Sequence, residues 1–206
     1  MKSDKFSDFK PLIYLITTGK ATAENFPVKS KEICKIIETA VETKISLVQI
    51  REKNLPARLV FELTARAVCL AQNSETKILV NDRADIALAA GADGVHLTAN
   101  SLPTEIIRQN YPPDFIIGVS AHSIEAAEAA RNRGADFATF SPIFHSPNKG
   151  KSKGLDELRK VCEKLNPFSV IALGGIDETN YREVLEIADG LAAIRFLNDA
   201  KNLKNF

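Results

Sequence analysis

Eight short apolar segments alternate along the chain with longer segments of helical periodicity, and this alternation limits the possible folds more than any other feature. The apolar segments are rich in strand-forming residues and almost uninterrupted in hydrophobicity, which is typical of parallel strands covered by helices. We expect strands over residues 12–17, 47–50, 77–81, 93–97, 115–119, 137–140, 169–173 and 190–195. We expect helices over residues 30–43, 83–90, 103–110, 123–133, 155–165 and 178–187, with a further helix that Pro56 opens and a fragmentary eighth in the C-terminal tail.

Two architectures fit this order of elements: an open doubly wound sheet and a closed (β/α)8 barrel. Eight strand–helix units favour the barrel, and 206 residues is close to the smallest length at which that fold occurs. We therefore predict an α/β fold of minimal size, a single TIM-barrel domain over residues 1–206. A weak internal repeat accompanies it: Gly-Ala-Asp at residues 91–93 and 134–136, and Ala-Asp at residues 188–189, each join a helix directly to a strand.

The composition excludes several classes of protein. Apolar residues make up 45% and charged residues 26%, as in ordinary globular domains, and no apolar run reaches the length of about 18 residues that a membrane-spanning helix needs. The 27 basic and 26 acidic residues leave a net charge of +1, unlike the strongly basic balance of most nucleic-acid-binding proteins. Residues 1–10 lack the features of a secretory signal. Cys34, Cys69 and Cys162 are an odd number of cysteines without a Cys-x-x-Cys pair, which argues against a disulfide framework and a zinc site. We expect a cytoplasmic protein with no nucleic-acid or membrane partner, and the sequence leaves a homo-oligomer open.

In a barrel of this kind the active site lies at the C-terminal ends of the strands, so the residues that follow each strand are the candidates. After the second predicted strand, Gln49, Arg51 and Lys53 alternate along the chain and so face the same side. An amide and two cations on one edge suit a polyanion such as a diphosphate, although a solvated strand end would look the same. After the third strand, Asp82 is either a Mg²⁺ ligand beside a substrate-binding Asn81 or the cap of the next helix.

Three polar residues, Ser120, His122 and Ser123, follow the fifth predicted strand. His122 is the best single candidate for acid–base chemistry, because imidazole titrates near neutral pH. The alternative is that Ser120, His122 or Ser123 only caps the next helix. His96, at the end of the fourth strand, is expected to be a hydrogen-bonded structural residue.

Anion-binding features follow the sixth, seventh and eighth strands. The loop over residues 141–154 carries three lysines, one histidine and no acidic residue, and is either a mobile cationic loop over an anionic substrate or a solvated surface loop. Gly174 and Gly175 precede a helix, where backbone N–H groups bind phosphate. We predict a cationic rim that suits small phosphorylated ligands, formed by Arg51, Lys53, Lys149, Lys151, Lys153 and Arg195.

Six short motifs occur in an order and spacing that resemble one family. They are Gln49-Ile-Arg-Glu-Lys53, Asn81-Asp-Arg83, Gly91-Ala-Asp-Gly-Val-His-Leu97, Gly118-Val-Ser-Ala-His122, Pro142-Ile-Phe144 with Lys149, and Ala172-Leu-Gly-Gly-Ile176. Over residues 12–197 the chain is similar to the thiamine phosphate synthases and their TenI-like relatives. The resemblance implies a (β/α)8 barrel that acts in thiamine biosynthesis.

The synthase branch joins hydroxymethylpyrimidine diphosphate to hydroxyethylthiazole phosphate and releases diphosphate, so the resemblance implies a transferase with two small phosphorylated substrates. By motif, the pyrimidine diphosphate would be bound by Gln49, Arg51, Lys53, Asn81 and Lys149. Ser120 would face the pyrimidine, and Asp82 would bind Mg²⁺. The thiazole phosphate would meet residues of the last three loops: Ser146, Asn148, Gly174 or Gly175, Ile194 and Arg195.

The chain departs from the synthase pattern at several positions. Ser101 stands where the synthases carry a second Mg²⁺-binding aspartate, which weakens a site made of hard oxygen ligands. Ser141 stands where the sixth loop usually begins with glycine, and Arg195 stands in place of a serine. The TenI-like branch also lacks that aspartate, and its activity is thiazole tautomerisation with a histidine that matches His122 as the acid–base group. The resemblance thus leaves three hypotheses: a synthase, a tautomerase that uses His122, or a phosphate-binding barrel without catalysis.

Overall fold

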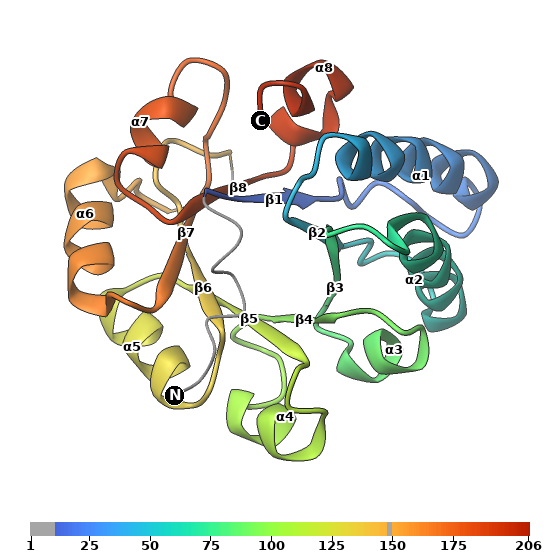
Figure 1. The fold of residues 1–206 in the computed structure, drawn as a ribbon, viewed down its shortest axis with the longest axis horizontal. Coiled ribbons are helices and arrows are strands. Elements are labelled where there is room, and N and C mark those ends of the chain that lie inside the picture. Colours follow the sequence, from blue (N-terminus) through green and yellow to red (C-terminus); the bar gives the residue numbers. More distant parts are fainter. Residues whose placement is uncertain (1–10, 148–149) are drawn as a thin grey trace.

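Eight parallel strands close into a barrel in the order of the sequence, with the last strand paired to the first. The computed structural model describes residues 11–147 and 150–206. Its strands are β1 (Leu12–Ile16), β2 (Leu47–Ile50), β3 (Lys77–Asn81), β4 (Gly94–Leu97), β5 (Ile116–Ala121), β6 (Phe137–Phe140), β7 (Ser169–Leu173) and β8 (Gly190–Ala193). Figure 1 shows the closed ring, which confirms the predicted (β/α)8 barrel over the open doubly wound sheet.

The helices lie outside the barrel and follow the strands in turn (Figure 1). They are α1 (Phe26–Glu42), α2 (Ala57–Ala71), α3 (Ala84–Ala89), α4 (Thr104–Asn110), α5 (Ile124–Asn132), α6 (Gly154–Leu165), α7 (Tyr181–Leu185) and α8 (Ala200–Leu203), with a 3-10 helix η1 (Phe196–Asn198) before α8. The short η1 and α8 form the fragmentary eighth helical unit that the sequence predicted.

Most helices begin within one residue of the predicted position, but two begin well away from it. Helix α1 begins at Phe26 rather than at residue 30, because Pro27 fixes a helical φ in the first turn and Phe26 is itself buried in the core. Helix α7 begins at Tyr181 rather than at residue 178, because the Asp177 carboxylate accepts the Thr179 N–H at 2.9 Å and holds the preceding residues in a turn.

Apolar side chains form two clusters on opposite sides of the sheet. The larger cluster packs between the strands and the helices and includes Val48, Ile37 and Leu63. The smaller cluster fills the inside of the barrel and consists of Leu12, Tyr14, Ile16, Leu47, Leu79, Ile116, Phe137, Ile171 and Ala192. Neighbouring strand residues alternate between the clusters, as Leu47 and Val48 do. The barrel is therefore a packed core, and room for a ligand is found at its ends.

The N-terminal ends of the strands are joined in pairs by side-chain hydrogen bonds, which we call the strand-start bonds. The residue just before each even-numbered strand accepts a bond from the N–H of the second residue of the preceding odd-numbered strand. The acceptors are Ser46, Asp93, Asp136 and Asp189, and their donors are Ile13, Ile78, Ile117 and Val170, at 2.8 to 3.2 Å. The repeated Ala-Asp of the sequence therefore marks a structural unit of two strands.

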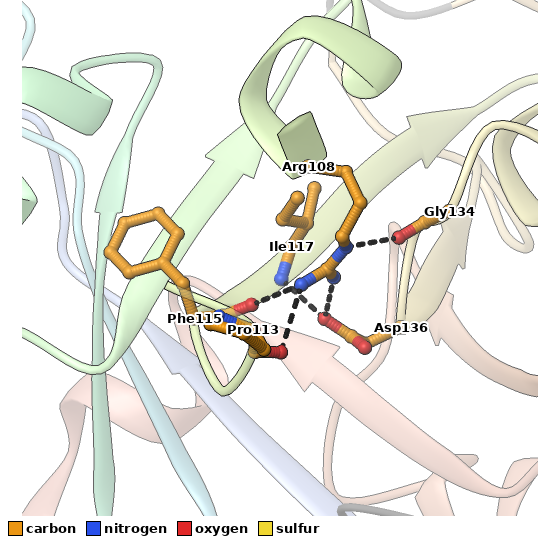
Figure 2. A network of polar contacts seen from close by, with 6 residues as sticks. All are labelled: Arg108, Pro113, Phe115, Ile117, Gly134 and Asp136. Carbon is orange, nitrogen blue, oxygen red and sulfur yellow. Dashed lines mark hydrogen bonds and ion pairs between the residues drawn. The ribbon is translucent and has the colours of Figure 1, made fainter. Parts of the chain in front are cut away.

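Arg108 of α4 strengthens the same end of the barrel (Figure 2). Its guanidinium donates to the carbonyl oxygens of Gly134 at 3.0 Å, Phe115 at 2.9 Å and Pro113 at 3.3 Å. It also pairs with the Asp136 carboxylate at 2.6 Å, and the two side chains are only 19% and 12% exposed. One cation thus ties α4 to the starts of β5 and β6 in a site largely removed from water.

The three cysteines, Cys34, Cys69 and Cys162, are free thiols. Burial raises the pKa of the Cys162 thiol to about 12, so this side chain is a packed, unreactive group. Across residues 11–147 and 150–206, no helix combines the length and the apolar character needed to cross a membrane.

Candidate active site

A cavity of about 620 Å³ opens at the C-terminal ends of the strands. This volume is usual for a small-molecule site. Most of the residues predicted from the sequence line it: Gln49, Arg51, Lys53, Asn81, Ser120, His122, Ser146, Gly174, Gly175, Ile194 and Arg195. Asp82 follows the lining residue Asn81 but does not itself line the cavity, and Asn148 and Lys149 lie outside the described residues.

The end of β2 supplies an amide and two cations to the cavity. Gln49 is 1% exposed and donates from Nε2 to the Tyr14 hydroxyl at 2.7 Å. Arg51 is half-buried, and its backbone N–H donates to Thr17 Oγ1 at 2.8 Å. The Arg51 guanidinium forms no ion pair within the described part of the chain, so its charge is available to a ligand. Lys53 lines the same cavity from a more exposed position.

Glu52 fixes the loop between β1 and α1 against Arg51. Its carboxylate is 3% exposed, and its two oxygens accept the N–H groups of Gly19 at 2.9 Å and Ala21 at 2.8 Å. Gly19 has a φ of +73°, which favours glycine, and a Cβ there would lie 3.4 Å from Arg51 Nη1, so this loop lies directly against the guanidinium. Sequence reasoning missed this role of Glu52, because its partners lie 33 and 31 residues away along the chain.

His96 forms part of the cavity floor. It is 3% exposed and packs against the rings of Tyr14 and Phe137, at centroid distances of 5.7 and 5.9 Å, and these two rings also contact each other at 5.6 Å. Burial, and then the positive charge of Arg51, lower the pKa of His96 to about 3, so the ring is neutral near pH 7. Its Nε2 lies 3.0 Å from Ser120 Oγ, on the part of β5 that extends beyond the predicted end of that strand. His96 is thus the hydrogen-bonded residue that the sequence predicted, but it also faces the ligand space.

His122 directly follows β5 and is exposed at the cavity. Its Nδ1 lies 2.9 Å from the carbonyl oxygen of Ser141. A carbonyl oxygen only accepts, so Nδ1 carries a proton and Nε2 of the neutral ring is the basic nitrogen. Ser123 caps α5 by accepting the Ala126 N–H at 3.2 Å. Of the three residues named as possible caps, Ser123 is thus confirmed as the cap, and Ser120 and His122 do not serve in that role.

The loops after β6 and β7 meet at Gly174 and Gly175. Both residues have positive φ, +102° and +69°. A Cβ on Gly174 would lie 2.9 Å from Pro142, and one on Gly175 would lie 2.6 Å from a carbonyl oxygen of the facing loop, so larger residues would push the loops apart. Ser146 Oγ lies beside Gly174, 3.4 Å from that Cβ position. Together with Arg195 after β8, these groups can bind an anion.

The ends of β3 and β4 offer one carboxylate to a metal. Asp82 is exposed with a φ of +67°, and it does not cap α3, whose first turn has no side-chain cap. Ser101 Oγ accepts the Thr98 N–H at 2.7 Å, which closes the loop after β4 on itself. In residues 11–147 and 150–206, no three His, Cys, Asp or Glu side chains are grouped as metal ligands. Asp82 alone could hold a Mg²⁺ ion only together with other oxygen ligands, such as the phosphate oxygens of a substrate.

The predicted cationic rim forms only in part among the described residues. Lys153 Nζ lies 3.7 Å from the Glu157 carboxylate and 5.4 Å from the centre of the Phe140 ring, so this cation is directed toward the protein. Lys151 is exposed but does not line the cavity. The rim residues that do line it are Arg51, Lys53 and Arg195.

Comparisons with known proteins agree with one another. The family described as thiamine monophosphate synthase matches residues 13–197. A Geobacter sulfurreducens protein, named provisionally as a thiamine-phosphate synthase, is 38% identical over 189 residues, which cover 90% of this chain and 84% of that protein. The thiamine-phosphate synthase of Caldanaerobacter subterraneus subsp. tengcongensis is 34% identical over 84% of this chain and 82% of its own length. The solved structure of thiamine phosphate pyrophosphorylase from Pyrococcus furiosus has a TM-score of 0.77 and 31% identity, and the match covers 95% of this chain and 94% of that one.

Proposed function

The chain belongs to the thiamine monophosphate synthase family, and we propose that it is a transferase that joins hydroxymethylpyrimidine diphosphate to hydroxyethylthiazole phosphate. The products are thiamine phosphate and diphosphate. We also propose that this step of thiamine biosynthesis takes place in the cytoplasm, where the three free cysteines would stay reduced.

The observation that carries the proposal is one cavity with anion-binding groups from two parts of the barrel. Arg51 and Lys53 enter it from the end of β2, whereas Gly174 and Arg195 enter it after β7 and β8. One substrate carries a diphosphate and the other carries a phosphate. Their reaction therefore needs two sets of anion-binding groups that lie close to each other. The neutral, polar floor that includes His96 suits an uncharged heteroaromatic ring.

In the proposed reaction, the bond between the pyrimidine methylene carbon and the diphosphate oxygen breaks, and the thiazole nitrogen forms a bond to that carbon. The electron pair of the broken bond leaves with the diphosphate. Arg51 and Lys53 would stabilise the charge that grows on this leaving group. Gln49, Asn81 and Ser120 would hold the pyrimidine half by hydrogen bonds. The roles of Lys149 with the diphosphate and Asn148 with the thiazole phosphate stay predictions from the sequence.

We propose that Mg²⁺ enters with the pyrimidine diphosphate. Asp82 and the diphosphate oxygens would hold the ion, which would offset part of the negative charge of the leaving group. Because Ser101 supplies no second carboxylate, we expect the free protein to bind Mg²⁺ weakly and the diphosphate complex to bind it more tightly.

Product analysis with both substrates tests the proposed function. The purified protein is incubated with the two substrates over a series of Mg²⁺ concentrations and with a chelator, and thiamine phosphate is measured by chromatography. We expect product only when both substrates and Mg²⁺ are present. The absence of thiamine phosphate at every Mg²⁺ concentration would overturn the synthase assignment.

A second candidate, thiazole tautomerisation, is favoured by the state of His122. The bond from Nδ1 to the Ser141 carbonyl leaves Nε2 able to take up and return a proton at the cavity. This reaction moves a proton within the thiazole phosphate carboxylate and needs neither Mg²⁺ nor a diphosphate site.

His122→Ala is the test of the tautomerase, with His145→Ala as the matched control because His145 is exposed on a neighbouring loop and does not line the cavity. Conversion of the tautomer should be lost in the first variant and kept in the second. Equal rates in parent and His122→Ala would rule out the acid–base role. Binding of thiamine phosphate without turnover of either reaction would support the third hypothesis, a phosphate-binding barrel without catalysis.

A further inference from the structure

The cavity floor contains a buried hydrogen bond whose direction is set by its surroundings. His96 Nε2 and Ser120 Oγ lie 3.0 Å apart, and both residues line the cavity. On the other side of the ring, Nδ1 is buried and has no hydrogen-bond partner in the part of the chain that the structure describes. Either nitrogen of a neutral imidazole can carry the proton, so the bond could run in either direction.

The environment of Nδ1 decides between the two directions. A proton on Nδ1 would be a buried N–H without an acceptor, which folded proteins avoid more strictly than an acceptor without a donor. The space beside Nδ1 is filled by the backbone of Gly118 and the ring of Phe137, because a Cβ on Gly118 would lie 2.8 Å from Nδ1 and overlap that ring. The proton therefore belongs on Nε2.

A doubly protonated ring is also disfavoured. A second proton would again place an N–H on Nδ1, which is buried and has no acceptor among the described residues. The aromatic neighbours Tyr14 and Phe137 offer no charge to offset a cation.

We propose that His96 is a positioning residue that makes Ser120 a hydrogen-bond donor to the ligand. When Ser120 Oγ accepts the Nε2–H of His96, the one proton of the serine hydroxyl is left to be donated into the cavity. This inference rests on the proposed function and deepens it. The ligand atom that receives the serine proton is an acceptor, such as a ring nitrogen of the pyrimidine.

The consequence is a means of recognising the substrate. A site that donates a hydrogen bond to a ring nitrogen discriminates strongly against a ring with C–H at that position, because the serine proton is then left without an acceptor. The pair His96–Ser120 would thus select a nitrogen heterocycle over a carbocyclic ring of the same shape.

The position of the proton is tested without any ligand, by NMR of protein labelled with ¹⁵N-histidine at pH 7. The chain has three histidines, and the spectrum of His96→Gln identifies the His96 signals by their loss. Long-range proton–nitrogen correlations distinguish a protonated ring nitrogen from a bare one. We expect a protonated Nε2 and a bare Nδ1. A protonated Nδ1, on a neutral or a cationic ring, would overturn the proposal, whether or not the protein is a synthase.

The direction of the bond to the ligand is tested by calorimetry. Binding of hydroxymethylpyrimidine diphosphate is compared with two analogues, each with one ring nitrogen replaced by C–H. We expect one analogue to bind the parent protein about tenfold more weakly or worse, and Ser120→Ala to remove most of this difference. His96→Leu should reduce the difference in the same way. His96→Gln, whose amide N–H can donate from near the position of Nε2, should keep it.

The outcomes separate the inference from the function on which it rests. If the parent shows no preference for either nitrogen, or if Ser120→Ala keeps the full preference, Ser120 is not the donor and the proposal is overturned. If none of the three compounds binds, the synthase assignment and the pyrimidine ligand fail together. A protonated Nε2 in the NMR spectrum would in that case still support the direction of the His96–Ser120 bond.

Discussion

Polar residues serve different purposes at the two ends of the barrel. At the N-terminal ends of the strands they bond to the protein itself, through the strand-start bonds and through Arg108, which contacts three carbonyl oxygens and the Asp136 carboxylate (Figure 2). At the C-terminal ends, Arg51 and Arg195 form no ion pair with any described residue, and both line the cavity together with His122. The polar residues at the N-terminal ends of the strands therefore stabilise the closed barrel, whereas those at the C-terminal ends face the ligand space.

Buried polar groups also occur at the ligand end, but they act on the residues that line the cavity. Glu52 binds the loop that packs against Arg51, and His96 bonds to Ser120. Each is 3% exposed, so its hydrogen bonds are protected from competition by water. The ligand end is therefore built in two layers, an accessible one that faces the ligand and a buried one that fixes it in place.

Removal of Arg108 is the strongest test of the structural end. Arg108→Ala takes away the cation that Asp136 faces, in a site where the two side chains are 19% and 12% exposed. We expect the free energy of unfolding, measured by urea denaturation, to fall by about 3–5 kcal/mol, because a charge in a largely buried pair loses its partner. The KM values of the protein that remains folded should not change.

The control for this variant is Arg133→Ala. Arg133 lies 3.9 Å from Glu105, and these side chains are 58% and 42% exposed. Removal of a surface pair of this kind should cost only about 0–1 kcal/mol. Equal losses in the two variants would show that burial of the Arg108 network adds nothing to stability.

Removal of Arg51 should lower the activity and leave the stability almost unchanged, the opposite of what we expect for Arg108. We expect Arg51→Ala to lower kcat/KM for the pyrimidine diphosphate about 10²- to 10³-fold, because the leaving group loses a cation. The free energy of unfolding should change by less than about 0.5 kcal/mol. Lys151→Ala is the matched control, since Lys151 is an exposed cation that does not line the cavity. If Arg51→Ala were unstable but fully active, Arg51 would stabilise the barrel and would not serve the ligand, which would contradict the division of roles between the two ends.

Acid pH should reveal the stability cost of the buried layer at the ligand end. The pKa of His96 is about 3 in the folded protein because of burial, against about 6.5 for an unperturbed histidine. Below pH 6.5 the unfolded chain takes up a proton that the folded protein does not, so the free energy of unfolding falls as the pH falls toward 3. The contribution is at most about 1.4 kcal/mol per pH unit in this window. Urea denaturation at pH 7 and pH 5 should show a smaller loss in His96→Gln than in the parent, and equal losses would contradict the assignment.

The strands could be placed from the sequence to within two residues at either end, because both of their faces are buried and their hydrophobicity is nearly uninterrupted. The lining residues Gln49, Arg51 and His122 could be found because they lie at the C-terminal ends of strands or directly follow them. The sequence predicted that His96 is hydrogen-bonded, but it could not identify Ser120 as the partner or find the role of Glu52, since these contacts join residues far apart along the chain. Gly118 did carry a signal for the place of His96. A glycine within a strand indicates that another group approaches its backbone closely, and here that group is the His96 ring.

The repeated Ala-Asp illustrates the same limit and leads to the smallest expected effect. Asp93 Oδ2 accepts the Ile78 N–H at 2.8 Å, and Oδ1 lies 3.4 Å from Lys77 Nζ in a partly exposed ion pair. Asp93→Asn keeps an oxygen for the strand-start bond and loses only the ion pair, so its free energy of unfolding should fall by at most about 1 kcal/mol. Asp93→Ala leaves the Ile78 N–H without that acceptor and should cost about 1–3 kcal/mol in the same urea experiment. Equal losses in the two variants would show that Asp93 stabilises the fold through its charge and not through the strand-start bond. A change in kcat/KM in either variant would show that the two ends of the barrel are not independent.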